Sequence, residues 1–204
     1  MKKEQYHHGD LRTCLLKTTI EMMNETGVDS VTMRALSQRV GVSRTAPYRH
    51  FTDKSELLHA VAEAGFNKLA QALREIRQTN DLDEVKRLQL MLKTIVLFAA
   101  SNTAYYTLMF EHLNTIHDIK HPLYIANDRV FKEILMMIAL CQQAHKIRPE
   151  NTLGLTHMTW ALTQGLANLA MHKVNHKKIV NDEFFTFTID TLIDGFKGNS
   201  SSYS

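Results

Sequence analysis

The sequence is poor in residues that interrupt helices or that would cross a membrane. Among 204 residues there are three prolines and eight glycines, so long stretches lack the turn signals that separate the strands of a sheet. The longest apolar run, at residues 134–141, is far shorter than the roughly 18 residues of a membrane-spanning helix. We therefore expect an all-α protein that has no membrane partner.

Cysteine is also scarce, and the two cysteines, Cys14 and Cys141, have no paired spacing. This argues against a disulfide framework and favours a reducing compartment. The N-terminus, with three charged residues among its first four, lacks the apolar segment of a secretory signal. We expect a cytoplasmic protein in which Cys14 is a small packing residue, with a redox-sensing thiol as the alternative.

Positive charge is concentrated in the first quarter of the chain. Residues 1–54 contain nine lysines and arginines against six acids, whereas the remainder is balanced at 15 against 15. Within residues 31–54 there are five basic residues and one acid, Asp53. Such a local excess is typical of a surface that binds a polyanion, although a solvated helix face has the same composition.

The same segment has the pattern of two short helices joined by a turn. Thr32 is placed to cap the first helix and Gly41 to end it, and Ser43 or Thr45 to cap the second. A short turn that contains glycine between two such helices is the helix-turn-helix signature. A preceding helix, from about residue 10 to residue 26, would hold them in place. Its inward positions are Leu11, Leu15, Thr19 and Met22.

The start of the next helix sets a cation against the helix dipole. Asp53 and Glu56 have the spacing of a capping box, and Lys54 takes the first helical position. A bound phosphate would resolve the conflict, because the free N–H groups of the helix start and the ammonium would both contact it. The alternative is an exposed lysine with a small tolerated cost.

Several motifs then occur in an order that is known from one family. They are Thr32-Met33-Arg34-Ala35-Leu36, Gly41-Val42-Ser43, Tyr48-Arg49-His50-Phe51 and Lys54-Ser55-Glu56-Leu57-Leu58. Residues 10–60 thus resemble the N-terminal domain of the TetR-type transcriptional regulators. The resemblance implies an all-α fold in which a three-helix helix-turn-helix DNA-binding domain precedes a larger helical ligand-binding and dimerisation domain. We place the first domain at residues 1–52, the second at 53–197 and a disordered, serine-rich tail at 198–204.

The resemblance also implies roles for individual side chains. The predicted DNA-binding set is Thr32, Ser43, Arg44, Thr45, Tyr48, Arg49, His50 and Lys54. The expected phosphate contacts are Thr32, Tyr48, His50 and Lys54. Arg44 would contact a guanine and Thr45 a thymine methyl, with Arg49 in either role. The implied core residues are Leu36, Val40, Val42 and Phe51.

Pro47 departs from the family pattern, which more often has leucine there. Because proline is acceptable only in the first turn of a helix, we expect the recognition helix to start near Ser43 to Thr45, with a 3₁₀ opening allowed. Ser37, where alanine is usual, is expected to bond back to a carbonyl.

Beyond residue 52, apolar periodicity and breaks predict six further helices. Their expected ranges are 53–78, 83–100, 103–113, 122–145, 151–174 and 182–196. The last two are the candidates for a homodimer interface. Their apolar stripes are Leu155, Met158, Leu162, Gly165, Leu166 and Leu169, and Phe185, Ile189, Leu192 and Phe196. The alternative is that both stripes close the core of a single subunit.

A ligand pocket is indicated by composition only. The candidate lining residues for a small apolar effector are Met91, Phe98, Tyr105, Met109, Phe110, Tyr124, Asn127, Phe131, Trp160 and Gln164. His172 and His176 are four apart, which a cation near a helix C-terminus explains better than a metal. No metal or other cofactor is expected.

Two functions follow from these patterns. One is a homodimeric repressor of a palindromic operator on double-stranded DNA, released when a small molecule binds. The other is a small helical enzyme or carrier of an apolar molecule. The sequence contains no nucleophile elbow, phosphate-binding loop or metal triad, which argues against an enzyme.

Overall fold

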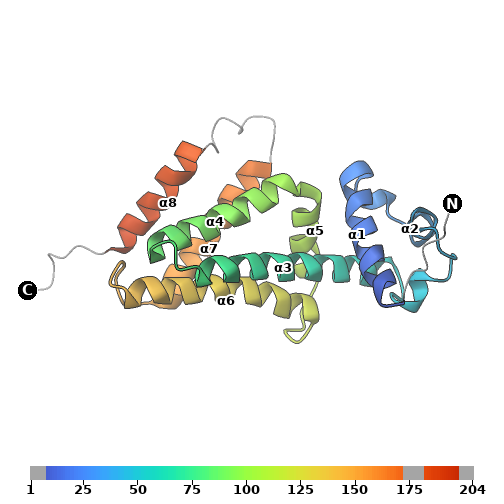
Figure 1. Cartoon of the computed structure of the whole chain (residues 1–204), viewed down its shortest axis with the longest axis horizontal. Helices are drawn as coiled ribbons and strands as arrows, with labels where there is room; N and C mark the ends of the chain where they lie inside the picture. The colour runs from blue at the N-terminus through green and yellow to red at the C-terminus, as the bar shows by residue number, and fades with distance from the viewer. Residues whose placement is uncertain (1–7, 172–181, 198–204) are drawn as a thin grey trace, which may run out of the picture. The chain divides into compact units, whose positions relative to one another are not determined.

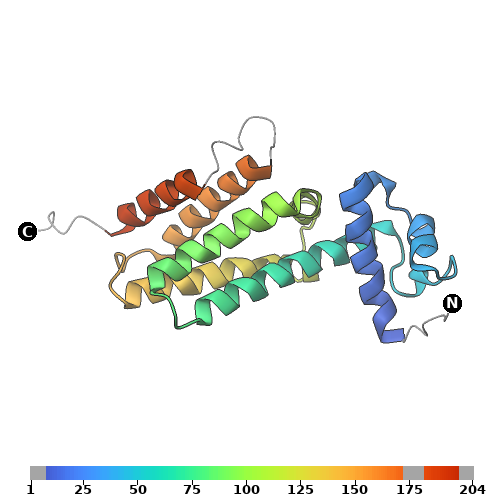
Figure 2. The same ribbon diagram turned by 45° about the horizontal axis from the view of Figure 1, so that its top comes forward.

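The computed structural model describes residues 8–171 and 182–197, and every regular element in that part of the chain is a helix. The chain divides into two compact units. The N-terminal unit comprises Met1–Gly65 and Ala104–Ile125, and the C-terminal unit comprises Phe66–Thr103 and Ala126–Ser204. Figures 1 and 2 show the helices of both units in two views.

The N-terminal unit is built on a small cluster of short elements. Its elements, with the helix that continues into the other unit, are α1 (His8–Thr26), η1 (Val28–Ser30), α2 (Met33–Val40), η2 (Pro47–Arg49), α3 (Lys54–Gln78) and α5 (Thr103–Leu113). Helix α1 packs against α2 and against the short helix η1, and α2 packs against the short helix η2.

Helix α1 has the inward face that its sequence predicts. Its four predicted inward side chains, those of Leu11, Leu15, Thr19 and Met22, are all buried, with exposed fractions of 9% or less. The Thr19 hydroxyl donates to the Leu15 carbonyl at 2.8 Å, so its burial leaves no unsatisfied donor. Gly27 ends the helix with a φ of 84°, which favours glycine.

Part of the predicted core of this unit is less buried than expected. Leu36 and Phe51 have exposed fractions of 0% and 2%, which confirms their core positions. Val40 and Val42 are only half-buried, and their prediction as core residues is wrong. Both flank Gly41, where the chain leaves α2, so the turn itself brings them to the edge of the core.

Helices α3 and α5 approach each other closely at Gly65. A Cβ atom added there would lie 2.6 Å from the Met109 sulfur and 2.9 Å from a ring carbon of Tyr105. The Tyr105 hydroxyl donates to the Val61 carbonyl of α3 at 3.1 Å. Burial raises the pKa of Tyr105 far above its usual value. A larger residue at this position would have to displace the side chains of Met109 and Tyr105, which are therefore packing residues of the crossing.

The C-terminal unit is a helical bundle. Besides the second part of α3, its helices are α4 (Glu84–Ser101), α6 (Pro122–Gln143), α7 (Thr152–Met171) and α8 (Asp182–Phe196). Helix α4 packs against α7, and α8 packs against both of them. Helices α3 and α6 run side by side in both views (Figures 1 and 2). The buried Glu133 of α6 joins them, because its two oxygens accept from Arg74 Nε at 3.0 Å and from Arg77 Nε at 2.8 Å.

The helices predicted beyond residue 52 agree with these bounds to within two residues wherever both ends are described. The predicted end of the fifth range at residue 174, His172, His176 and the tail at 198–204 lie outside the described residues. Because α5 clusters with the N-terminal unit, the compact units do not follow a division at residue 52. That domain boundary stays a prediction. Along the described chain, no helix combines the length and the apolar character needed to span a membrane.

Half of the residues predicted for the dimer interface are buried inside the single chain. Leu155, Leu166, Phe185, Ile189 and Phe196 have exposed fractions of 6% or less. A side chain that is already buried has little surface to give to a partner, so the burial of these five favours the alternative that the stripes close the subunit's own core. The assignment of the two stripes to a homodimer interface stays a prediction. Met158 and Gly165 are exposed, and Leu162, Leu169 and Leu192 are half-buried.

Candidate nucleic-acid interface

Helix α2 is bounded by the residues that its sequence predicts. The Thr32 hydroxyl oxygen accepts from the Ala35 N–H at 3.1 Å and caps the helix start. Gly41 ends the helix with a left-handed φ of 77°. The N–H groups of Gly41 and Val42 both donate to the Ser37 carbonyl at 3.0 Å. The Ser37 hydroxyl bonds back to the Arg34 carbonyl at 2.8 Å, as expected.

The segment that follows, residues 43–50, is a chain of tight turns rather than an α-helix; we call it the reading segment. An α-helix capped by Ser43 would need a first bond from the Pro47 N–H, which proline lacks. The Ser43 carbonyl accepts instead from the Ala46 N–H at 3.0 Å. Pro47 is buried at the start of the 3₁₀ helix Pro47–Arg49. The predicted α-helical start near Ser43 to Thr45 is therefore wrong, although the 3₁₀ geometry is present.

The reading segment exposes most of its polar side chains. Ser43, Arg44, Thr45 and Arg49 are exposed, and 55% of the surface of Tyr48 is accessible. The hydroxyls of Ser43 and Thr45 lie 3.2 Å apart, within hydrogen-bond distance. His50 and Lys54 are half-buried, and Thr32 is exposed. The predicted DNA-binding residues thus lie on neighbouring turns, and their contacts with DNA stay a prediction.

Two of the five basic residues in this region are held by the protein itself. Both guanidinium Nη atoms of Arg39 donate to the two carboxylate oxygens of Glu25. This contact lowers the pKa of Glu25 and raises that of Arg39. The Lys54 ammonium donates to the Val28 carbonyl of η1 at 3.0 Å. The sequence predicted that Lys54 either contacts a phosphate or is simply exposed. Neither prediction included this bond to a backbone carbonyl.

The remaining three basic residues of the region are Arg34, Arg44 and Arg49, and all are exposed. Among the side chains of residues 11–171 and 183–197, none of them has a carboxylate partner. The net positive charge of the surface is therefore localised on these guanidinium groups. Arg34, in the first turn of α2, was not predicted as a DNA-binding residue. It differs from Arg39 and Lys54 only because those two side chains bond to other groups of the protein, which the sequence does not indicate.

The start of α3 is fixed by a double cap. The Glu56 N–H donates to Asp53 Oδ1 at 2.9 Å, which is the predicted first half of a capping box. The second half is displaced by one residue, because Glu56 Oε2 accepts from the Thr52 N–H at 2.6 Å and from its hydroxyl at 2.7 Å. These two bonds lower the pKa of Glu56. The Arg12 guanidinium lies 5.4 Å from the centre of the Phe51 ring, a cation–π contact that no sequence pattern indicated.

Three histidines meet in the N-terminal unit although they are far apart in sequence. The ring centre of His59 lies 4.9 Å from that of His112 and 5.5 Å from that of His121. His121 Nδ1 accepts from the Leu123 N–H at 3.1 Å and caps α6. Burial lowers the pKa of His59, and His121 lowers it further, while Asp53 opposes the shift. Burial and His59 lower the pKa of His112, against Glu111.

The residues predicted for a ligand pocket are divided between the two units. Tyr105, Met109, Phe110 and Tyr124 belong to the N-terminal unit, and the other six belong to the C-terminal unit. Met91 is fully buried, and Tyr124 is 39% exposed. The half-buried members are Phe98, Phe110, Asn127, Phe131, Trp160 and Gln164. Phe131 lies edge-on to Trp160, with ring centres 6.4 Å apart, and Asn127 Oδ1 is buried without a hydrogen-bond partner in the described structure.

The thiol of Cys141 is in an unreactive setting. It is fully buried, and its burial raises its pKa to about 12. Within the described ranges, no three histidine, cysteine or acidic side chains are arranged to bind a metal ion.

Two short helical elements joined by a glycine turn and backed by α1 are the helix-turn-helix arrangement. The fold therefore places the chain among the helix-turn-helix DNA-binding proteins. Residues 15–61 match the model of the tetR family of bacterial regulatory proteins. Residues 88–192, more than half of the chain, match the model of the tetracyclin repressor-like C-terminal domain. The chain belongs to the TetR family of transcriptional regulators.

Individual relatives are similar to this chain over different lengths. The class C tetracycline repressor of Escherichia coli is 42% identical over 53 residues, which are 26% of this chain and 24% of that protein. The nucleoid occlusion factor SlmA of Aliivibrio fischeri is 30% identical over 103 residues, covering 48% of this chain and 50% of that one. The matches thus span a quarter to a half of these relatives. A solved Rhodococcus sp. RHA1 protein of unknown function is 27% identical, with a TM-score of 0.84 over 96% of this chain and 100% of that chain.

Proposed function

We propose that the protein is a homodimeric repressor that binds a palindromic operator through its reading segment and is released by a small apolar effector. The observation that most favours DNA binding is the set of exposed guanidinium groups of Arg34, Arg44 and Arg49, which no carboxylate of the described chain neutralises. Arg44 and Thr45 would contact bases, and Thr32, Tyr48, His50 and Lys54 phosphates. Such a protein works where the chromosome is, in the cytoplasm.

A dimer would use the outer faces of α7 and α8. Three large apolar side chains lie exposed there, Leu153 at 54%, Met158 at 53% and Phe187 at 68%. Gly165 is exposed in the middle of α7, and a Cβ atom at that position would meet no atom within 4 Å. Glycine inside a helix costs about 1 kcal/mol relative to alanine. Because nothing inside the subunit requires it, close approach of a partner helix is its proposed use.

An apolar effector is supported by the half-buried rings of the C-terminal unit. Phe98, Phe131 and Trp160 combine apolar surface with partial exposure. The buried Asn127 oxygen provides one unsatisfied polar atom, a common feature of small-molecule sites. An effector that binds one conformation of the dimer more tightly would change the spacing of the two reading segments and weaken DNA binding.

The DNA-binding proposal is tested by selecting bound sites from random double-stranded DNA and measuring affinity for them by fluorescence anisotropy. We expect a palindromic sequence and two chains per site by sedimentation. The affinity should fall by about 0.9 logarithmic units per contacted phosphate for each tenfold rise in salt concentration. Absence of sequence-selective binding at moderate salt contradicts the proposal and favours the alternative, a helical enzyme or carrier of an apolar molecule.

The effector is tested on the same complex. Trp160 is the only tryptophan of the chain, so small apolar aromatic compounds can be screened by the change in its fluorescence. A compound that binds and weakens DNA binding supports release by an effector. Tight binding that leaves DNA affinity unchanged contradicts it, because a ligand shifts an equilibrium only by its difference in affinity for the two states.

A further inference from the structure

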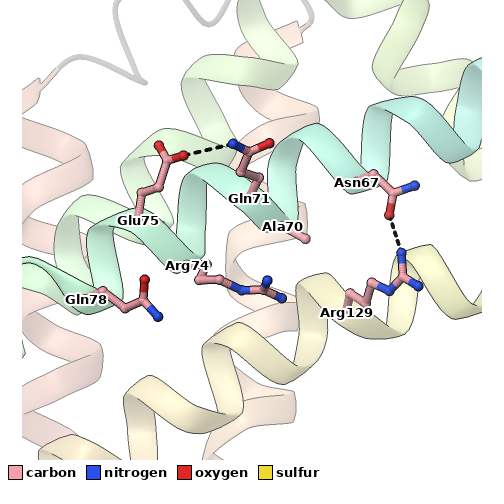
Figure 3. A pocket seen from close by; sticks show the side chains of 7 residues that line it. All are labelled: Asn67, Ala70, Gln71, Arg74, Glu75, Gln78 and Arg129. Carbon is pink, nitrogen blue, oxygen red and sulfur yellow. Dashed lines mark hydrogen bonds between the residues drawn. The ribbon is translucent and has the colours of Figure 1, made fainter.

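A polar groove lies between α3 and α6 in the C-terminal unit, and none of the residues predicted for the effector pocket lines it. Its volume is about 500 Å³. Ala70, Arg74 and Gln78 of α3 and Arg129 of α6 line it (Figure 3). The α3 positions are four apart, so they follow one face of the helix. Ala70 is the short side chain in this row and leaves room between the long polar ones.

The groove contains more positive than negative charge. Glu133, with an exposed fraction of 1%, is the carboxylate for both Arg74 and Arg77. One charge of that group of three is therefore not balanced. Arg129 Nη1 donates at 2.7 Å to Asn67 Oδ1, an uncharged amide oxygen, and so keeps its full charge.

The one acidic residue of the lining is turned away from these arginines. Glu75 Oε1 accepts from Gln71 Nε2 at 3.0 Å. Figure 3 shows this pair on the side of α3 opposite to Arg74 and Arg129, which both extend into the space between the two helices. An anion between Arg74 and Arg129 would thus face two guanidinium groups on the side of α3 opposite to Glu75.

We propose that the α3–α6 groove binds a small organic anion whose carboxylate or phosphate group is held between Arg74 and Arg129. Arg74 uses its Nε for Glu133, 53% of its side chain is exposed, and its guanidinium group extends into the space between the two helices (Figure 3). Arg129 uses one of its five N–H donors for Asn67. Guanidinium groups with such donors bind carboxylate and phosphate with paired hydrogen bonds.

The ligand of this groove differs in kind from the proposed apolar effector. The volume is that of a site for a small metabolite, but five of the seven lining residues present an amide or a guanidinium group. The groove lies between α3, which follows the reading segment in the chain, and α6, a helix of the bundle. Its occupancy is measurable in the absence of DNA, so the outcome is independent of the proposed function.

The test is isothermal titration of the full chain with citrate and, separately, with inorganic phosphate, at an ionic strength held constant with sodium chloride. We expect saturable binding of one of them, and the one that binds identifies the headgroup. Arg129→Gln is expected to weaken this binding about tenfold, the typical effect of losing one charge-assisted hydrogen-bonding group.

Lys68→Gln is the matched control, because it removes the same charge from an exposed position of α3 outside the lining. We expect its binding to remain within about twofold of the natural protein. Helical circular dichroism of both variants checks that they fold. Lack of saturable binding of both probes overturns the proposal, and so does an equal loss in the two variants, which would indicate only a general effect of charge.

Discussion

The helix-turn-helix segment and α7 are held in place by different kinds of contact. In residues 32–56, the side chains that cap the helices bond to backbone groups at most four positions away: Thr32 to Ala35, Asp53 to Glu56, and Glu56 to Thr52. In α7 the buried face contains Thr156, Thr159 and Thr163, whose exposed fractions are 0%. Their position depends on the helices that pack against α7, which are α4 and α8. The first region is defined by local chemistry, and the second by its neighbours.

The hydrogen bonds of the three α7 threonines explain how polar side chains can form a buried helix face. Each hydroxyl donates to the carbonyl four residues earlier, at 2.8 Å for Thr156, 2.8 Å for Thr159 and 2.7 Å for Thr163. A satisfied hydroxyl presents little more than its methyl group to the neighbouring helix. Apolar periodicity therefore could not tell the inner face of α7 from the outer one, where Leu153 and Met158 are exposed.

The largest expected effect contrasts two residues of this helix that were predicted to lie together at the dimer interface. Leu155→Ala should lower the free energy of unfolding by about 2–5 kcal/mol, because it removes a side chain that is buried in the subunit. Met158→Ala should change it by less than about 0.5 kcal/mol, since half of that side chain is in solvent. Urea denaturation below the dimer dissociation constant measures both.

The same pair also tests the interface. Sedimentation equilibrium should show a weaker dimer for Met158→Ala, and equal destabilisation by the two substitutions would mean that the burial assigned to α7 is wrong. A monomer that stays folded after Met158→Ala would locate the partner on the outer face.

Much of the fold could be predicted because the relevant signals are local. Gly41 and Thr32 determine the ends of α2 by their own geometry, and the ends of most helices follow from similar residues. The pairing of Arg39 with Glu25 and of Lys54 with the Val28 carbonyl joins positions 14 and 26 residues apart. No spacing rule indicates such contacts. They decide which lysine and arginine side chains of residues 31–54 remain without a partner in the described part of the protein.

The second effect in size concerns the reading segment. Arg44→Ala should cost about 1–3 kcal/mol of DNA-binding free energy, concentrated at one base position, if its guanidinium contacts a guanine. Anisotropy titrations over a set of single-base operator variants measure the distribution. A uniform loss over all variants would assign Arg44 to the phosphates.

Lys54→Ala is the comparison for this experiment. It should weaken every operator variant alike and reduce the salt dependence by about one phosphate, since an ammonium that contacts the backbone reads no base. Its unfolding free energy has to be measured as well, because the ammonium also donates to the Val28 carbonyl. A change confined to one base position would contradict a phosphate contact.

A smaller effect tests the local chemistry of α2. Thr32→Ala should lower the free energy of unfolding by about 1 kcal/mol, because the Ala35 N–H loses its cap. Thr191→Ala is the matched control: its hydroxyl bonds back to the Phe187 carbonyl within α8, where alanine is the better helix former. Thermal unfolding should show the first variant less stable and the second unchanged or more stable. Equal loss in both would mean that the cap is not what stabilises α2.

The smallest effect concerns the histidine cluster, which lies in the N-terminal unit and yet has no local signature. The pKa values of His59 and His112 are lowered in the folded chain, so the unfolded chain binds more protons near their ordinary pKa of 6.5. Stability contributed by the neutral rings is therefore fully present above about pH 6.5 and is lost as the pH falls through the folded values. Unfolding free energies at a series of pH values should decrease on acidification.

The variant His112→Gln should reduce this dependence of the unfolding free energy on pH, whereas His117→Gln, at an exposed position of the same unit, should leave it unchanged. If both substitutions reduce the pH dependence of the unfolding free energy equally, the contact of His112 with His59 does not cause that dependence.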